Sequence, residues 1–296
     1  MKEKRTIGGR IFDIFNVILL LFLIIITVYP VWNQFILSFA DRQYLYAVTP
    51  QWYPKSINLD GYKAVLKYKD IWMGYLNTII RTVLGTFLCL LCTAMFAWPL
   101  TKKELPGNSL ISKAIVFTML FGGGMIPSYL LINNTLHLNN TIWALILPML
   151  VTPYNVFIMR NFFLTVPEAL EESARIDGAG YFRIFWQIIM PLSKPVLATV
   201  ALWIAVGHWQ AWYDNLLYLQ DPSRWGLQMV LREILVSNQS TNMQQAVAAA
   251  FGSTTAVDER QLNSVVIIVG ILPMVVIYPF LQKYMNKGVI LGAVKG

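Results

Sequence analysis

The sequence predicts an all-α integral membrane protein with six transmembrane helices in a single domain, residues 1–296. Hydrophobic residues make up 56% of the chain, against about 45 to 50% in soluble domains. Charged residues make up only 13%, roughly half the usual share. With a mean hydropathy of +0.55, the chain has more apolar surface than one soluble core of this length can enclose. Lipid is therefore expected to cover the remainder.

Charge-free intervals locate the six helices, because about 20 apolar residues cross a bilayer and an ionised side chain at its centre is costly. Five intervals lack Asp, Glu, Lys and Arg: 14–40, 82–101, 114–159, 195–213 and 261–282. The third has 46 residues, and its polar run 133–141 predicts an external hairpin between two helices. The predicted spans are about 14–37, 76–99, 114–132, 142–162, 190–212 and 262–282.

The start of the chain combines four cations with an apolar run, a combination that also occurs in signal peptides. Here the run is longer than the about 7 to 15 residues of a signal-peptide core, although Ser38 and Ala40 resemble a cleavage site. The sequence therefore favours an uncleaved first helix.

Lysine and arginine residues predict the orientation, because they are enriched in cytoplasmic loops. Fourteen of the 23 lie in the N-terminal tail, around residues 101–113, in residues 160–194 and in the C-terminal tail. The other nine lie on the opposite side together with eight of the 15 acidic residues, and Arg81 is expected to snorkel toward that surface. Both termini are therefore predicted to be cytoplasmic.

Other functional classes fit the composition poorly. The net charge of +8 and the pI near 9.4 do not indicate nucleic-acid binding, since the cations lie between apolar runs instead of forming one patch. Cys89 and Cys92 are spaced like a redox pair but lie inside an apolar run, without a nearby cation or helix start to activate a thiol. They are predicted to be small residues in the lipid phase, and no metal site is predicted.

Two external segments are long, residues 40–75 and 213–260. In the second, apolar residues recur at helical spacing across 225–237, and an alanine-rich stretch follows at 244–251. The sequence predicts short external helices that cap the spans. Contact with an extracellular partner and packing against the bilayer surface are both open as their role.

A cytoplasmic segment between the fourth and fifth spans, residues 165–191, carries the strongest functional signal. Thr165 as the N-cap, Pro167 in the first turn and Glu168 three residues after the cap predict a helix start. Gly178 is expected to end this helix with a positive φ, and a second short helix is expected over 181–188.

Small residues on this helix leave a shallow surface that fits another protein's groove, while Glu171, Glu172 and Asp177 supply charge. The alternative, a helix that lies on lipid headgroups, is disfavoured because the cytoplasmic leaflet is itself anionic. The segment is therefore predicted to dock a cytoplasmic partner.

A motif in this segment consists of Glu172, Ser173, Ala174, Gly178, Ile188, Met190 and Pro191. Its spacing over 20 residues resembles the EAA loop of ATP-binding cassette (ABC) importer permeases. Serine stands at Ser173 in place of the usual alanine, and methionine stands at Met190 in place of the usual leucine.

Other stretches resemble the carbohydrate branch of that family, the maltose-permease-like second subunit. They are Asn77 and Thr78 at the start of the second span, the turn 102–107 and the tail 292–296. Residues 122–127, Gly-Gly-Gly-Met-Ile-Pro, further resemble the subgroup associated with complex polysaccharides and aldouronate-type oligosaccharides. The resemblance covers roughly residues 10–296 and implies the type I ABC importer fold.

The resemblance implies a machine of several chains in a bacterial cytoplasmic membrane. A second homologous permease subunit pairs with this one, two ATPase subunits bind ATP and magnesium, and an extracellular or periplasmic solute-binding protein delivers an oligosaccharide. This chain is expected to hold no cofactor and to be non-catalytic. It lacks the glycine-rich loop, ending in Gly, Lys and Ser or Thr, that cradles a triphosphate.

The resemblance also implies which residues couple transport to ATP, since closing the ATPases must change the relative stability of two permease states. They are Glu171, Glu172, Ser173, Ala174, Asp177 and Gly178. Gly178 is expected to set the angle at which motion passes to the neighbouring spans. Residues 294–296 are expected either to reach between the ATPases or to form a frayed terminus.

Polar and aromatic residues inside the spans predict a sugar path. The candidates are Tyr154, Asn155, Trp203, His208 and Trp209. Aromatic faces suit the C–H surfaces of sugars, but Trp and Tyr also form interfacial belts, which explain Trp212 and Tyr213 better than the deeper Trp203. Pro153 predicts a helix break that turns Tyr154 and Asn155 toward a cavity.

Two alternatives stay open. An ABC importer permease for peptides or amino acids shares the same loop, so only substrate binding separates it from a sugar permease. An ATP-independent carrier or channel fits less well, because the spans show no ion-coupling pair apart from the peripheral Arg81, and no inverted repeat is visible.

Overall fold

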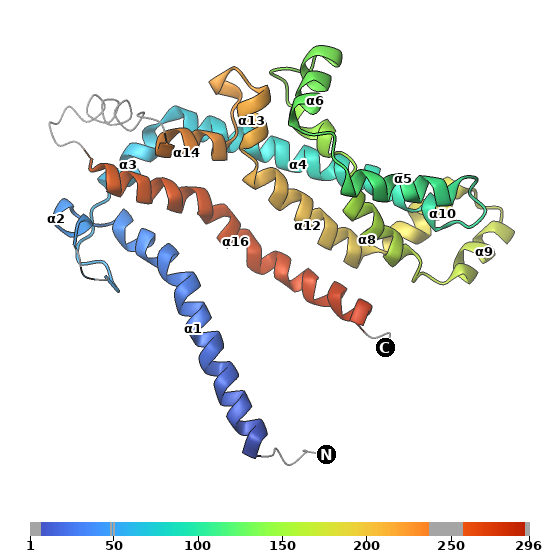
Figure 1. The fold of residues 1–296 in the computed structure, drawn as a ribbon, viewed down its shortest axis with the longest axis horizontal. Helices are drawn as coiled ribbons and strands as arrows, with labels where there is room; N and C mark the ends of the chain where they lie inside the picture. The colour runs from blue at the N-terminus through green and yellow to red at the C-terminus, as the bar shows by residue number, and fades with distance from the viewer. Residues whose placement is uncertain (1–6, 48, 50, 237–256, 294–296) are drawn as a thin grey trace. The chain divides into compact units, whose positions relative to one another are not determined.

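The computed structural model describes residues 7–47, 49, 51–236 and 257–293, and every regular element in them is helical (Figure 1). The chain divides into two compact units, which are described separately. Unit 1 comprises residues 1–68 and 233–272, and unit 2 comprises residues 69–232 and 273–296. The alanine-rich stretch 244–251 and the tail 294–296 lie outside the described residues, so the expectations for them stay predictions.

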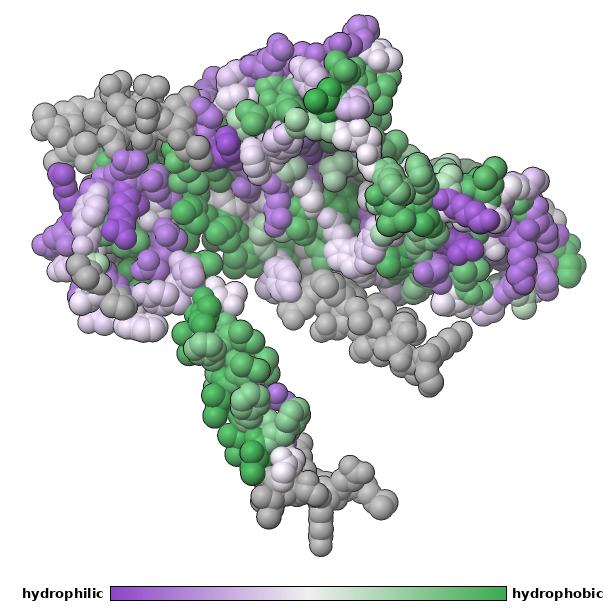
Figure 2. Space-filling view, viewed as in Figure 1, coloured by the Kyte–Doolittle hydropathy of each residue, from purple (hydrophilic) through white to green (hydrophobic). Residues whose placement is uncertain are grey.

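Unit 1 contains α1 (Ile7–Ser38), α2 (Arg42–Leu45), α3 (Asp60–Lys67) and the first part of α16 (Glu259–Ala293). α1 exposes large apolar side chains between Ile11 and Trp32, visible as the green helix in Figure 2. A helix that is apolar on every side needs lipid or another membrane helix to cover it.

Polar contacts join α1 and the residues just before α3 to α16 within unit 1. Gln261 Nε2 donates to the carbonyl oxygens of Ser38 (3.4 Å) and Asn58 (3.2 Å). Ser264 Oγ donates to Gln34 Oε1 (2.8 Å). These hydrogen bonds fix the C-terminal end of α1 against α16, because a buried polar group that lost its partner would be costly.

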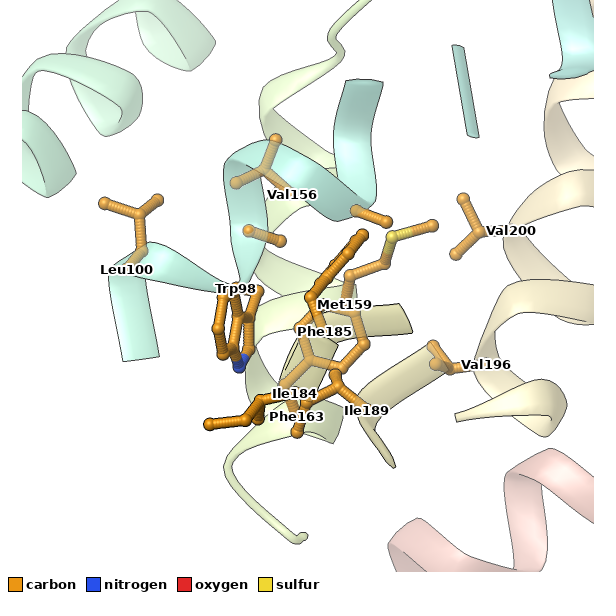
Figure 3. Close-up of a cluster of buried hydrophobic side chains, with 12 residues drawn as sticks. Trp98, Leu100, Val156, Met159, Phe163, Ile184, Phe185, Ile189, Val196 and Val200 are labelled. Carbon is orange, nitrogen blue, oxygen red and sulfur yellow. The ribbon is translucent and has the colours of Figure 1, made fainter. Parts of the chain in front are cut away.

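Unit 2 is built around α4 (Lys69–Ala97), which packs against α8 (Pro153–Phe163) and α12 (Lys194–Gln210). A cluster of twelve buried residues, drawn in Figure 3, joins the C-terminal end of α4 to these helices and to the segment between them. The cluster consists of Ala94, Ala97, Trp98, Leu100, Val156, Met159, Phe163, Ile184, Phe185, Ile189, Val196 and Val200. It positions both ends of the segment that the sequence singles out.

The other elements of unit 2 are shorter. They are η1 (Pro99–Thr101), α5 (Asn108–Leu120), α6 (Met125–Leu130), η2 (Leu131–Thr135), α7 (Trp143–Ile146), η3 (Leu147–Met149), α9 (Glu168–Ile176), α10 (Tyr181–Ile184), η4 (Phe185–Ile189), α11 (Met190–Leu192), α13 (Tyr213–Tyr218), η5 (Pro222–Arg224) and α14 (Leu227–Val236). The last of these confirms the helix predicted over 225–237; α14 lies in unit 2 as far as residue 232.

Three helical stretches are long and apolar enough to cross a membrane: Ile11–Ser38, Lys69–Thr101 and Glu259–Pro279. Three further stretches reach that length only as bent pairs of helices. They are Asn108–Leu120 with Met125–Thr135, Trp143–Met149 with Pro153–Phe163, and Tyr181–Leu192 with Lys194–Gln210. By length and composition, the described residues therefore hold three spans, or up to six if each bent pair is one span.

Glycine and proline explain the bends. The first pair bends by 110° at residues 121–124, inside the predicted span 114–132, where Gly124 has φ +86°. A side chain rarely adopts that conformation, so a glycine at the N-cap allows α6 to start in a new direction. The second pair bends by 51° just before Pro153, which confirms the predicted helix break. The third bends by 82° where Pro195, which lacks an N–H, interrupts the helical hydrogen bonds.

The polar run 133–141 turns the chain as predicted, although its first residues are still helical in η2. His137 (φ 52°) and Asn140 (φ 56°) both adopt the left-handed conformation. Asn140 N donates to the Tyr218 carbonyl (2.8 Å), which ties this turn to α13.

Candidate functional site

The predicted docking helix is α9, and it begins at Glu168 with Pro167 in the N-cap position. The expectation that Thr165 caps the helix is wrong: its hydroxyl donates to the Phe162 carbonyl (2.7 Å), at the end of α8. The reason is that a residue before proline avoids the helical conformation, so Val166 cannot start the helix. Glu168 and Glu171 lie in the first turn, where their charge complements the helix dipole.

Gly178 ends α9 as predicted, with φ +79°. Gly178 N donates to the Arg175 carbonyl (3.0 Å) and Ala179 N donates to the Ala174 carbonyl (2.8 Å). This pair of hydrogen bonds is the Schellman motif, which depends on a left-handed residue at the position of Gly178. The chain then enters α10 at Tyr181, where the second short helix was predicted, and continues through η4 to Leu192.

The side chain of Glu171 turns inward, away from the surface of α9. It is 9% exposed and forms an ion pair with Lys102, which follows η1 at the end of α4. Lys102 Nζ also lies 5.2 Å from the centroid of the Trp98 ring, a member of the cluster in Figure 3. The charge of Glu171 is therefore compensated inside this chain, and it anchors α9 to α4.

The turn that carries Lys102 is itself held by two neighbouring helices. The Leu100 carbonyl accepts hydrogen bonds from Arg160 Nε of α8 (2.8 Å) and Asn108 Nδ2 of α5 (3.2 Å). Asn108 Nδ2 also donates to the Lys102 carbonyl (2.7 Å). The ends of α4, α5, α8 and α9 therefore form one polar junction.

The exposed surface of α9 is mixed in character. Glu172, Ser173 and Asp177 are exposed, as is Gly178, while Ala174 is half-buried against the cluster. Ile176 is 86% exposed, and the adjoining Phe182 of α10 is 73% exposed. Apolar side chains of this size between acidic ones make a surface that suits a protein partner.

A cavity of about 310 Å³ brings together four of the five predicted path residues, Tyr154, Asn155, Trp203 and His208. Tyr154 and Trp203 lie opposite each other in it, with ring centroids 6.0 Å apart and planes tilted by 36°. The fifth residue, Trp209, is not among the described lining residues; it is buried, with its ring 6.4 Å from that of Tyr75.

Arg81 does not snorkel to the surface, contrary to the sequence expectation. Its side chain is 2% exposed and forms an ion pair with Asp214, the second residue of α13. Arg81 Nε donates to His208 Nδ1 (3.4 Å), and Nη2 donates to the Leu145 carbonyl (3.4 Å). The sequence missed this pair because Asp214 lies just beyond the predicted end of the fifth span, where water was expected to cover both charges.

Close packing lets Arg81 reach His208. A Cβ added to Gly85 would lie 2.5 Å from His208 Nε2, so only glycine allows α4 to approach α12 this closely. Cys89 Sγ lies 3.7 Å from the same nitrogen, and both Cys89 and Cys92 are free thiols. Cys89 is thus buried within the protein and not in the lipid phase as predicted, because α12 packs His208 against it.

Comparison with known proteins identifies the family. Residues 10–291 match the family described as the binding-protein-dependent transport system inner membrane component. Protein LplC of Bacillus subtilis (strain 168) is 40% identical over 98% of this chain and 97% of its own length. The polygalacturonan/rhamnogalacturonan transport system permease protein YtcP of the same strain is 35% identical over 97% of this chain and 99% of its own length.

A solved structure supports the same assignment. The crystal structure of a bacterial ABC transporter involved in the import of the acidic polysaccharide alginate contains a chain with a TM-score of 0.87 and 30% identity, covering 94% of this chain and 98% of that one. This chain belongs to the family of binding-protein-dependent transport system inner membrane components.

Proposed function

We propose that this chain is a permease subunit of an ATP-driven importer that carries an oligosaccharide across a bacterial cytoplasmic membrane. The observation that carries this proposal is the family match across residues 10–291. It is supported by α9, whose exposed acidic and apolar side chains form a surface fitted to a partner. YtcP is named a permease protein, and we assign no catalysis to this chain.

The proposed partners follow from this function. A second homologous permease completes the path, two ATPase subunits bind ATP and magnesium, and a solute-binding protein delivers the sugar from outside. Glu172, Ser173, Asp177 and Gly178 are proposed to contact an ATPase, because their side chains or backbone are exposed on α9. Glu171 and Ala174 are proposed to act from within this chain by holding α9 in place.

An oligosaccharide is the proposed substrate. YtcP is named for polygalacturonan and rhamnogalacturonan, and the structural relative takes part in alginate import. Tyr154 and Trp203, whose rings contact each other, both line the cavity, and aromatic faces suit the C–H surfaces of a sugar ring. His208 and Asn155 add polar groups to the same wall.

The proposed topology has six spans with both termini in the cytoplasm. Three spans are continuous helices and three are the bent pairs. A bent span in lipid is tolerated where the freed backbone groups are buried in protein or line a cavity. The bend before Pro153 meets this condition, because Thr152, Tyr154 and Asn155 line the cavity described above.

One observation favours the rival function of an ATP-independent carrier. Arg81 and Asp214 form a buried ion pair of the kind that couples ions to transport in such carriers. However, the two charges compensate each other and tie α4 to α13 and α12. The pair is explained as a structural link, and the family match favours the importer.

Uptake into proteoliposomes tests the function. The four-subunit complex is reconstituted with its binding protein, and a radiolabelled galacturonate oligosaccharide is offered outside. We expect uptake only with ATP inside the vesicles and with the binding protein outside. Uptake that persists with a non-hydrolysable ATP analogue would favour the carrier. Uptake of a peptide in place of the oligosaccharide would favour a permease for a non-sugar solute.

A further inference from the structure

A second cavity in unit 2, of about 620 Å³, lies between α5 and α8 and is lined by three cations, Lys103, Lys113 and Arg160. None of its described lining residues is acidic. In the part of the chain that the structure describes, these three cations have no ion-pair partner. The cavity is therefore a concentrated and uncompensated positive site.

The lining also includes two hydroxyl groups, of which that of Ser112 donates to Asn108 Oδ1 (3.2 Å). Ser109 and Ser112 lie three residues apart on α5, so both face the cavity together with Lys113. α5 has no acidic residue in its first turn and no side-chain N-cap. The positive end of its dipole thus adds to the field of the three cations.

One edge of the cavity is apolar. Val116, one turn beyond Ser112, and Phe157 of α8 both line it. Beyond this edge, α5 exposes Phe117 (59%) and Leu120 (71%). The site therefore places cations and hydroxyls at one end and an exposed apolar helix face at the other.

We propose that this cavity binds the headgroup phosphate of an anionic phospholipid from the cytoplasmic leaflet. The positive end matches a phosphodiester, and the apolar edge matches the start of the acyl chains. Basic pockets between transmembrane helices on the cytoplasmic side are known to take such headgroups. The proposal rests on the cytoplasmic placement of the α5 start in the proposed function.

A bound lipid has a consequence for the coupling junction. Arg160 lines the cavity and donates from Nε to the Leu100 carbonyl, two residues before Lys102. Asn108 also lines the cavity and holds both the Leu100 and the Lys102 carbonyls. An anionic headgroup would thus stabilise the turn that anchors α9.

Native mass spectrometry of the assembled transporter tests the site. The complex is released from bilayers of equal parts phosphatidylglycerol and phosphatidylcholine, and retained lipids are counted. We expect the wild-type complex to retain phosphatidylglycerol in preference to phosphatidylcholine. Lys103→Gln and Lys113→Gln should each reduce this preference about fivefold, because one cation near an anionic surface contributes ~1 kcal/mol. The variant with Lys103→Arg and Lys113→Arg should keep the preference.

Lys194→Gln is the matched control, because Lys194 is an exposed lysine at the start of another helix, α12, and is not among the described residues lining the cavity. Equal loss of phosphatidylglycerol in Lys194→Gln, or no preference in the wild type, would overturn the proposal. Displacement of the lipid by inorganic phosphate would also overturn it, because it would indicate a site for a free anion. A cross-link from Ser109→Cys to an ATPase subunit would overturn it as well, because it would indicate that a protein occupies the cavity. Labelling of Ser109→Cys only from outside would instead overturn the topology.

Discussion

Lys102 and Glu171 form an ion pair beneath α9, and it joins the end of the long helix α4 to the helix that we propose docks an ATPase. The side chains of Lys102 and Glu171 are 21% and 9% exposed, so water screens the pair only in part. The chain itself links α9 to α8 on one side and to α10 on the other. The ion pair connects α9 directly to the end of α4, and α4 packs against both α8 and α12.

The first prediction concerns this ion pair. Lys102→Glu and Glu171→Lys each place two like charges together, at a cost on the order of 1 to 3 kcal/mol, between the values for exposed and buried pairs. Each single variant should lose most ATP-driven uptake in proteoliposomes. The double variant, which restores opposite charges, should recover at least half of the wild-type rate.

A mismatched double variant controls for net charge. Lys102→Glu combined with Glu168→Lys carries the same charges, but Glu168 is exposed at the start of α9 and does not face Lys102. This combination should recover no uptake. If the Lys102→Glu, Glu171→Lys double variant is as inactive as the singles, the ion pair does not anchor the helix.

Gly178 and Gly180 provide a matched pair for the second prediction. A Cβ added at either position would have no described atom within 4 Å apart from its chain neighbours, so space does not distinguish them. Gly178 has φ +79° whereas Gly180 has φ −73°. Gly178→Val should therefore cost about 1 to 3 kcal/mol in backbone strain and abolish uptake, while Gly180→Val should be tolerated.

A substitution of Gly178 by asparagine distinguishes backbone strain from other effects of an added side chain, because asparagine tolerates the left-handed conformation. Gly178→Asn should retain much of the uptake that Gly178→Val loses. Wild-type uptake in both Gly178→Val and Gly180→Val would show that the conformation of Gly178 does not matter for transport.

The sequence predicted α9 and its end correctly because local chemistry decides them. A glycine eleven residues beyond the proline that precedes α9 leaves few other ways to turn. The candidate path residues were chosen because aromatic and polar side chains are out of place in lipid. The convergence of four of the five on one cavity, however, depends on the packing of α8 against α12.

The two ion pairs could not be predicted in the same way. Lys102 and Glu171 are separated by 69 residues, and Arg81 and Asp214 by 133. No local sequence pattern relates positions so far apart. Each of these four charged residues, taken alone, was expected to lie at the membrane surface in contact with water. The 110° bend likewise depends on three glycines whose conformation the sequence leaves open.

Arg81 and Asp214 carry the third prediction. Arg81→Met or Asp214→Asn leaves the other charge unpaired, and loss of one partner of a buried pair costs about 3 to 5 kcal/mol. Each single variant should lower the temperature at which the purified complex unfolds. The double variant should be more stable than either single variant, since no unpaired charge remains. A double variant whose destabilisation is the sum of the two singles would contradict the pairing.

Trp203 carries the fourth prediction. Trp203→Ala removes one of the two aromatic faces of the cavity, so the KM for oligosaccharide uptake should rise about threefold to tenfold, or ~0.7 to 1.4 kcal/mol. ATP hydrolysis without the binding protein should stay unchanged. The control is Trp143→Ala, because Trp143 is similarly exposed (42%) and is not among the described residues lining this cavity. An equal KM effect in both variants would remove Trp203 from the sugar path.

The central claim is that α9 couples this permease to ATPase subunits, and Glu172 tests it most directly. Glu172→Ala removes an exposed charge, and its loss should weaken docking to the ATPase by roughly 1 to 3 kcal/mol if that charge is paired at the interface. The control is Glu168→Ala, which removes another exposed charge from the same helix. The measurement is ATP hydrolysis by the reconstituted complex, with and without the loaded binding protein. We predict that Glu172→Ala assembles but loses most of the stimulation, while Glu168→Ala keeps it. Full stimulation in an assembled Glu172→Ala complex would contradict the account.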